Sequence, residues 1–143
     1  RIFFFFFSCA SFAKQFDLPI MDVNQFLVER LVRSKLVHRY QRLAVHIDCS
    51  TAKHCFNPEF MAILRLCAYE IVVPDGIKCC GFAGDKGFTT PELNASSLSG
   101  LAAQVSECEI GVTFNRSCQI GLNQHSGIKY ISFIELILDC LKV

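Results

Sequence analysis

The stretch IVVPDGIKCCGFAGDKGFTTPEL, residues 71–93, shows the fold pattern of the chain in a short space. It opens on a β-branched run typical of a buried strand, which Pro74-Asp75-Gly76 ends as a turn. Two adjacent cysteines and three glycines follow in a loop. Thr89-Thr90-Pro91-Glu92 then combines a capping hydroxyl, a first-turn proline and an early acid. We therefore expect a strand, a cysteine loop and a helix that runs to about Glu107.

The same alternation of strand and helix extends to both sides of this stretch. In chain order, the pattern predicts a strand at 43–47, a helix at 60–69 opened by Asn57-Pro58-Glu59, a strand at 109–114, a short helix at 115–124, a strand at 128–132 and a closing amphipathic helix at 133–141. Strands that alternate with helices of about ten to fifteen residues are typical of parallel sheets. We expect an α/β fold, a Rossmann-like parallel sheet with helices on both faces.

Four cysteines each follow one of these strands. Cys49 comes after the first strand, Cys79 and Cys80 after the second, and Cys118 after the third. In open parallel sheets, sites form beyond the carboxyl ends of the strands. All four thiols should therefore lie at the same rim of the sheet.

Adjacent cysteines have a restricted chemistry. Their Cα atoms lie about 3.8 Å apart, closer than the usual disulfide range, so a bridge between Cys79 and Cys80 would be strained. Paired zinc ligands normally have two to four residues between them. Two adjacent cysteines would therefore crowd each other on a single zinc ion. Binding to two different irons of one cluster relieves that constraint. The alternative to a metal site is a purely structural one, a glycine loop with two small buried cysteines.

The glycines of the loop fit a cluster site. Gly81 lacks a Cβ directly beside the thiols, so the backbone can approach and direct N–H groups at sulfur. Gly84 and Gly87 keep the turn free of side chains. The helix that starts near Pro91 is expected to point its positive end toward this site.

Composition limits the class of protein. The 143 residues are 52% apolar and carry a formal net charge of +1, which suits one domain with a sizeable core. No basic stripe is visible, so a nucleic-acid partner is not expected. The apolar stretch 2–13 is too short to span a bilayer, and we expect no transmembrane segment. It is interpreted as a buried strand or as the end of a fragment.

The nine cysteines favour a reducing, cytoplasmic compartment over a secreted one. Cys67 and Cys140 lie in apolar runs with a helical pattern, and Cys9 lies in another apolar run. Free cysteine is commonly buried like a small apolar residue. We expect these three side chains in the core.

Three segments together resemble a known family: HIDCS, CCGFAGDKGFTTPELNASSL and NRSCQIGLNQHSGIKY. They are similar to the cysteine-rich CCG domain, and most like the last such domain of FAD and iron–sulfur D-lactate dehydrogenases. Glycolate oxidase iron–sulfur subunits and heterodisulfide reductases belong to the same wider group. The resemblance covers roughly Pro19 to the C-terminus.

The resemblance implies a ligand set for a 4Fe–4S cluster. Cys49, Cys79, Cys80 and Cys118 match the family's cysteines, whereas Asn115 stands where the first cysteine of a C-x-x-C pair is expected. Four thiolates remain, enough for one ordinary cluster. The other residues considered are Cys108 and Cys55 as possible extra ligands, and Gly81, Gly84, Gly87, His46 and Asn115 as support for the cluster loop.

The resemblance also implies partners. Flavin and ferredoxin-type domains of a parent protein would hold FAD and oxidise a D-2-hydroxy acid, and electrons would leave toward a quinone or another acceptor. Such a protein would be cytoplasmic or peripheral on the inner face of the membrane. A fragment of 143 residues without flavin-binding sequence is not expected to oxidise lactate alone. The alternatives are a zinc-stabilised or metal-free assembly module and a thiol redox enzyme.

Segments 18–32 and 128–142 each read as a strand followed by a helix with Phe and Glu near its start. This weak internal similarity suggests that residues 1–36 are the end of a preceding CCG repeat or a fragment leader. Residues 37–143 then form the C-terminal CCG domain of a longer protein.

Overall fold

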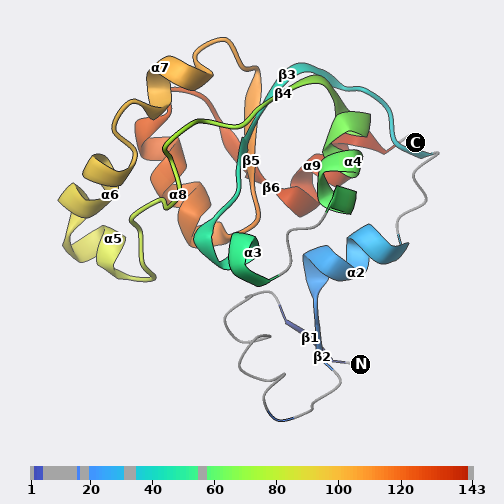
Figure 1. Cartoon of the computed structure of the whole chain (residues 1–143), viewed down its shortest axis with the longest axis horizontal. Coiled ribbons are helices and arrows are strands. Elements are labelled where there is room, and N and C mark those ends of the chain that lie inside the picture. Colours follow the sequence, from blue (N-terminus) through green and yellow to red (C-terminus); the bar gives the residue numbers. More distant parts are fainter. Residues whose placement is uncertain (1, 5–15, 17–19, 31–34, 55–57, 142–143) are drawn as a thin grey trace.

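A four-stranded parallel sheet forms the centre of the molecule in this computed structural model, which describes residues 2–4, 16, 20–30, 35–54 and 58–141 (Figure 1). Its strand order is β4-β3-β5-β6, with bounds Ala68–Val72, Tyr40–His46, Ile110–Thr113 and Tyr130–Ser132. All three strand pairings are parallel. A separate parallel pair joins β1 (Ile2–Phe4) to β2 (Ile20–Asp22). The predicted α/β class with a parallel sheet is confirmed.

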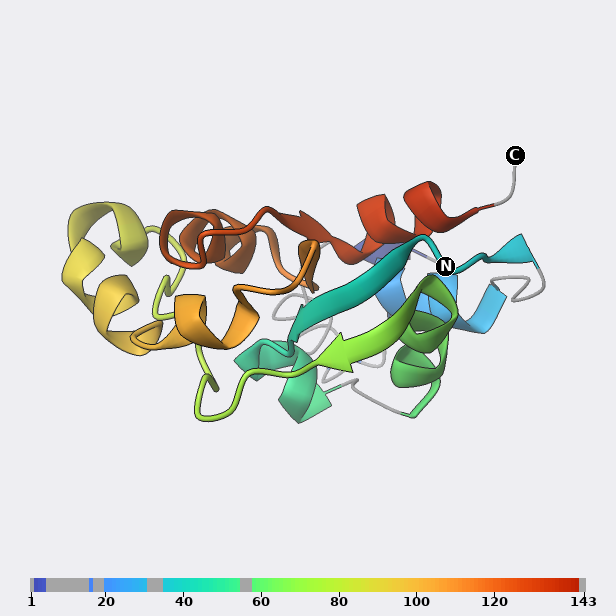
Figure 2. The ribbon, with the colours of Figure 1, turned by 90° about the horizontal axis from the view of Figure 1, so that it is seen from above.

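Helices occupy every connection between strands of the main sheet, and one further helix lies before β3 and another after β6. They are α2 (Val23–Arg30), α3 (Cys49–His54), α4 (Pro58–Cys67), α5 (Lys86–Thr89), α6 (Pro91–Ser97), α7 (Leu101–Val105), α8 (Arg116–His125) and α9 (Phe133–Cys140). Figures 1 and 2 both show α5 to α8 grouped at one end of the molecule, and α2, α4 and α9 at the other. The two groups belong to two different hydrophobic cores.

Strand β3 divides these cores because successive side chains of a strand point to opposite faces. Leu43 and Val45 belong to the core of α2, α4 and α9, whereas Ala44 belongs to that of α7 and α8. All three side chains are fully buried. Helices therefore cover both faces of the sheet, as the sequence predicts.

Aromatic rings fix the first core. Phe60 of α4 lies edge-on to Phe114, with ring centroids 5.2 Å apart, and both rings contact Phe133 at the start of α9. Such tilted and edge-to-face pairs add about 0.5–1.5 kcal/mol beyond the burial of their area. Phe114 directly follows β5, so this packing also fixes where that strand ends.

Tyr130 dominates the second core, where its ring lies across β5. A Cβ added at Gly111 would sit 2.5 Å from the Tyr130 ring, so only glycine leaves room for it. Asn123 of α8 donates to the Tyr130 carbonyl at 3.1 Å and accepts from its N–H at 2.7 Å. These contacts hold α8, and with it the loop after β5, against the sheet.

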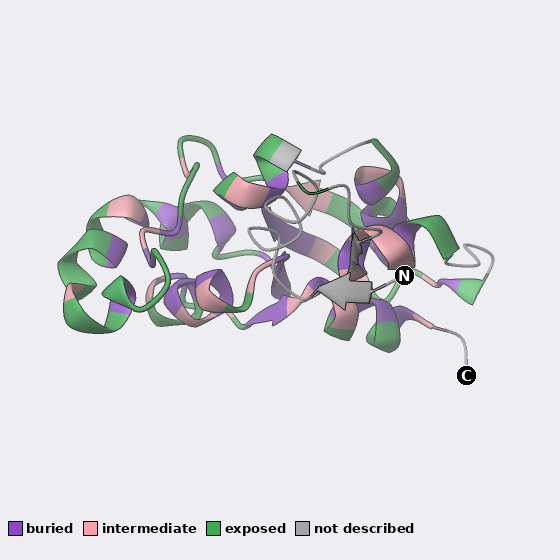
Figure 3. Ribbon diagram, turned by 90° about the horizontal axis from the view of Figure 1, so that it is seen from below, coloured by how far each residue is buried: buried purple, intermediate pink, exposed green. Residues whose placement is uncertain are grey.

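Burial is uneven along the molecule. Figure 3 shows buried residues along the central strands and mostly exposed residues on α5 and α6. Cys67 and Cys140 are fully buried, as expected, whereas Cys9 lies outside the described residues. Among the helices that the structure describes, none has the length and apolar character needed to cross a bilayer.

The helix expected from Pro91 to about Glu107 is wrong in one respect: the segment forms two helices, α6 and α7. Gly100 separates them with a left-handed φ of 81°, a conformation that interrupts a right-handed helix. Thr90 precedes α6 as expected, but its hydroxyl makes no capping hydrogen bond. The short helices α3 and α5 were not predicted, and Asn57 lies outside the described residues.

Candidate metal centre

The order in which the chain adds strands to the sheet reverses between β3 and β5, and the four motif cysteines meet at this point. The chain leaves β3 toward β4 on one side of the sheet. It then crosses to β5, on the other side of β3, and leaves β5 toward β6, farther in that direction. The loops after β3 and β5 therefore diverge, which leaves a crevice at the carboxyl ends of these strands. Cys49 follows β3 and Cys118 follows β5.

A cavity of about 240 Å³ occupies this crevice. Its lining residues are Asp48, Cys49, Ser50, Cys79, Cys80, Ala83, Gly84, Asn115, Ser117 and Cys118. The lining thus contains all four cysteines that the sequence singles out, from three separate segments of the chain. Cys80 and Cys118 are buried in its wall, whereas Cys49 and Cys79 are exposed.

Two of the sulfur atoms touch. The Sγ atoms of Cys80 and Cys118 lie 2.8 Å apart and share a hydrogen bond, and the Cys79 thiol is a neighbour of Cys49. The backbone N–H of Gly81 donates to the Cys79 sulfur at 3.4 Å. The sequence analysis expected a backbone N–H directed at sulfur beside Gly81, and this is such a contact.

These contacts change the acidity of the thiols. The hydrogen bond between the two thiols lowers the pKa of Cys80 and raises the pKa of Cys118. Burial, followed by the neighbouring Cys79 thiol, raises the pKa of Cys49. A cysteine binds metal as the thiolate. Of the two touching thiols, Cys80 is therefore the one that ionises more readily.

Asp48 fixes the position of Cys49 and was missed by the sequence analysis. Its buried carboxylate accepts hydrogen bonds from the Ser50 hydroxyl at 2.5 Å, the Thr51 hydroxyl at 2.8 Å and the Thr51 N–H at 3.0 Å. An acid with this pattern caps a helix, and here the helix is α3, which begins at Cys49. The run Asp-Cys-Ser-Thr was the available signal.

The loop after the two cysteines is held in an unusual backbone shape. Gly81 has a φ of 69° and Ala83 a φ of 45°, so one residue with a side chain also adopts the left-handed region. Gly84 shares that region and lines the cavity. Gly87 has a different role, because a Cβ there would collide with the Phe82 ring.

Asn94 of α6 holds the cysteine loop through a contact with its backbone. Its buried side-chain amide donates to the carbonyl of Cys80, and a Cβ at Gly121 of α8 would collide with that amide. The same residue therefore connects α6, α8 and the loop. No local pattern in the sequence marks it, since its partner lies 14 positions away.

We predict that Asn94→Ala destabilises the domain by about 2 kcal/mol, because a buried carbonyl loses its partner. It should also speed the loss of any bound metal to a chelator, since Cys80 is no longer held. Asn123→Ala is the matched control, because it removes backbone contacts of Tyr130 rather than of a cysteine. Equal rates of metal loss in both variants would contradict a positioning role for Asn94.

Asn115 lies on the cavity lining and caps α8. Its side-chain oxygen accepts from the N–H of Ser117 at 3.1 Å and from the Ser117 hydroxyl at 2.9 Å. This role explains locally why an asparagine suits this position, where the motif resemblance leads one to expect a cysteine. Ser117, next to Cys118, also lines the cavity and was not predicted.

Not every predicted site residue joins the cavity. His46 is buried, with Nδ1 3.5 Å from the Thr113 hydroxyl, and burial lowers its pKa. Within the part of the chain that the structure describes, its Nε2 has no hydrogen-bond partner. Cys108 precedes β5, at the opposite end of that strand from Cys118, and is not on the lining. Cys55 lies outside the described residues.

The expected helix at Pro91 does not reach the cavity lining either. Within the described residues, the lining contains no member of the first turn of α6. It contains instead the starts of α3 and α8, through Cys49, Ser117 and Cys118. The positive helix ends near the thiols are therefore those of α3 and α8.

The donor set of the cavity consists of four thiols. Among the residues that the structure describes, no group of three or more His, Cys, Asp or Glu is arranged as a metal site. In an iron–sulfur cluster each thiolate binds a different iron, so four cysteines on one cavity lining supply the number of ligands that a 4Fe–4S cluster needs. Binding would replace the contact between Cys80 and Cys118 with separate metal bonds. The Asp48 carboxylate is already occupied by its hydrogen bonds.

Comparison with known proteins points to the same chemistry. Over 135 residues, 91% of this chain, the sequence is 27% identical to the glycolate oxidase iron–sulfur subunit of Escherichia coli (strain K12). The chain spans 33% of the length of that relative. No family model matches the chain, and no solved structure matches it. The similarity is thus to an iron–sulfur subunit of an oxidoreductase.

Proposed function

We propose that this chain is an electron-transfer domain that holds a 4Fe–4S cluster in the cavity between β3 and β5. The observation that carries the proposal is the convergence of Cys49, Cys79, Cys80 and Cys118 on one cavity from three segments. Similarity to an iron–sulfur subunit over most of the chain supports it. When bound, the cluster would supply one-electron transfer to the protein.

The residues of the chain have separable roles in this proposal. The four cysteines provide the thiolates, and Cys80 ionises more readily than Cys118. Asp48 holds Cys49 through the start of α3, and Asn94 holds Cys80 through its carbonyl. The Gly81 N–H stabilises negative charge on the Cys79 sulfur. Three of the four proposed ligands, Cys49, Cys79 and Cys80, thus have a named supporting contact.

We propose further that the complete protein is a flavin-dependent D-2-hydroxy-acid oxidoreductase, with D-lactate as the leading substrate. The motif resemblance supports D-lactate, and the similar Escherichia coli protein is a subunit of a glycolate oxidase. D-Lactate and glycolate are both 2-hydroxy acids. Flavin and ferredoxin-type domains would deliver electrons to this chain, which would pass them to a quinone or another acceptor. The protein would then work in the cytoplasm or on the inner face of the membrane.

The second candidate function is a zinc-stabilised or metal-free module for subunit assembly. It is favoured by the exposed apolar side chains of Phe88 and Leu93 on α5 and α6, which are 66% and 47% exposed. Phe88 lies edge-on to Phe82 at 4.9 Å, so it is held outward by a buried ring. An assembly module would retain its contacts after the loss of iron, whereas an electron carrier would lose its function.

A Cys79→Ser variant of the complete oxidoreductase tests the role in electron exit. Its flavin should still be reduced by D-lactate or glycolate in a single turnover at the unchanged rate. Transfer onward to a quinone should be at least about tenfold slower, a loss of about 1.4 kcal/mol or more. Cys108→Ser, a buried cysteine off the cavity lining, should leave both rates unchanged. Collapse of flavin reduction in Cys79→Ser would place the domain in the catalytic site and contradict the proposal.

A further inference from the structure

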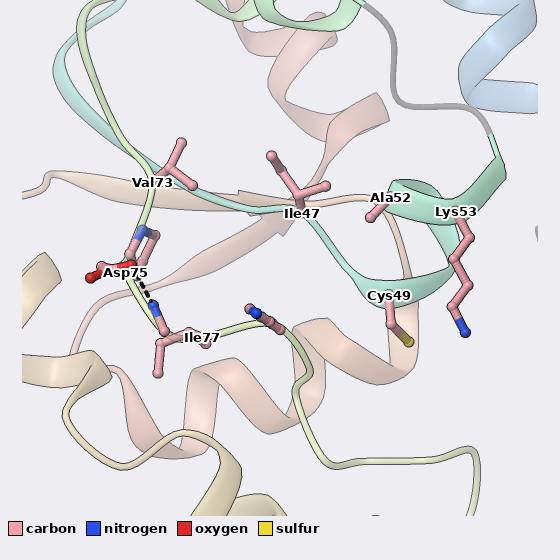
Figure 4. Close-up of a pocket in the computed structure, with 10 residues that line it drawn as sticks. Ile47, Cys49, Ala52, Lys53, Val73, Asp75 and Ile77 are labelled. Carbon is pink, nitrogen blue, oxygen red and sulfur yellow. Dashed lines mark hydrogen bonds between the residues drawn. The ribbon is translucent and has the colours of Figure 1, made fainter.

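A second, larger cavity of about 460 Å³ lies next to the candidate metal centre. Figure 4 shows Val73, Asp75 and Ile77 of the segment after β4 on one side, Ala52, Lys53 and Cys49 of α3 on the other, and Ile47 between them. Its volume falls in the range of small-molecule sites, about 300–1,000 Å³. It also lies beyond the carboxyl ends of two neighbouring parallel strands, where ligands bind in such folds.

The walls of this second cavity are mostly apolar. Ile47 directly follows β3, and Val73, Pro74 and Ile77 come from the segment after β4. Val73 remains 48% exposed, although a β-branched side chain at the end of a strand usually packs inward. An apolar surface inside a concavity is typical of a site for an apolar ligand body.

Two lysines give the cavity its charge. Lys53 of α3 and Lys78 of the loop both lie on the lining, and neither side chain forms an ion pair or hydrogen bond with any residue that the structure describes. Asp75 is the carboxylate on the same lining, and its side chain accepts from the Gly76 N–H at 2.9 Å. Two ammonium groups against one carboxylate leave the cavity with a net positive charge.

The segment after β4 is held in place before any ligand binds. Gln104 of α7 accepts from the Asp75 N–H at 2.7 Å and donates to the Asp75 carbonyl at 3.1 Å. Pro74, the preceding residue, is buried and has a fixed φ. A preformed wall reduces the ordering cost of binding.

From these features we propose that the second cavity binds a small organic anion with an apolar body about the size of one or two rings. The body packs on Ile47, Val73 and Ile77, and a carboxylate meets the ammonium groups of Lys53 and Lys78. This site does not depend on a metal in the neighbouring cavity. Cys49 lines both cavities, so the bound anion covers one side of that residue.

Fluorescence titration of the protein with 2-naphthoate tests this site, with the neutral 2-naphthalenemethanol as the matched probe. Naphthoate should bind saturably and at least tenfold more tightly than the alcohol. Val73→Glu should weaken naphthoate binding at least tenfold, because it places a carboxylate against the ligand. Lys78→Met and Lys53→Met should each weaken it about threefold to tenfold.

Lys129→Met is the control, since Lys129 is an exposed lysine outside the cavity lining. It should bind naphthoate like the unchanged protein. All the substituted side chains are exposed, so circular dichroism should show unchanged melting. Equal affinity for the acid and the alcohol, or unchanged binding in Val73→Glu, would overturn the proposal. An equal loss in Lys129→Met would do the same.

Discussion

Replacing Cys80 with serine is expected to abolish the visible absorbance of the anaerobically purified protein. It should also lower the melting temperature by about 10 °C, or about 3 kcal/mol for a domain of this size. Cys80 is 3% exposed, lines the cavity and touches Cys118, so its removal deprives the centre of a ligand at its buried wall. Metal binding contributes directly to folding stability in such sites.

Cys108→Ser separates the loss of a ligand from the loss of a buried sulfur. Cys108 is also buried, but it precedes β5 and lies off the cavity lining. We expect this variant to keep the full absorbance with a smaller loss of stability. Retained absorbance in Cys80→Ser would exclude Cys80 as an essential ligand.

The second large effect is expected for Gly81→Ala. Gly81 has a φ of 69°, and a Cβ there would lie 2.5 Å from the Ser97 hydroxyl and 2.6 Å from the Leu93 carbonyl of α6. A left-handed residue costs about 1–3 kcal/mol, and the forced contact with backbone adds a similar amount. Chemical denaturation should therefore show a loss of about 3 kcal/mol or more. The displaced loop should also lower metal retention.

Gly84→Ala is the matched control for this substitution. Gly84 has nearly the same φ, 74°, but a Cβ there would meet nothing within 4 Å. It should show the backbone cost alone, about 1–2 kcal/mol. If the two variants lose the same stability, the packing of Gly81 against α6 does not hold the cysteine loop.

Simple sequence patterns were enough to predict the main sheet and to predict that the four cysteines lie together at its rim. The runs at 43–47 and 109–114 have too many apolar residues for surface strands, and the alternation with helices implies parallel pairing. Parallel strands end at one rim, so cysteines placed directly after them must come together. Cys108 could have been excluded by the same rule, because it precedes its strand.

Other parts of the site depend on tertiary contacts that no local pattern encodes. Asn94 looks like an ordinary helix residue, and only the folded structure brings its amide to Cys80. The division between α6 and α7 follows from Gly100, whose left-handed φ is one of several conformations that glycine permits. The start of α3 had a local signal in Asp48, which the sequence analysis did not use.

The boundary between two repeats at residues 36 and 37 remains a prediction. Segment 18–32 does contain a strand followed by a helix, β2 and α2, like β6 and α9 near the other end of the chain. Val28 of α2 is buried in the same core as α4 and α9. Helix α2 therefore packs with the second proposed domain in this structure.

Metal and sulfide analysis of the anaerobically purified protein tests the central claim most directly. The proposal predicts about four irons and four acid-labile sulfides per chain, with broad visible absorbance that bleaches on reduction with dithionite. The four thiols on one cavity lining are the structural basis for this expectation. One zinc ion per chain without sulfide, or a protein that folds with no metal at all, would contradict the account.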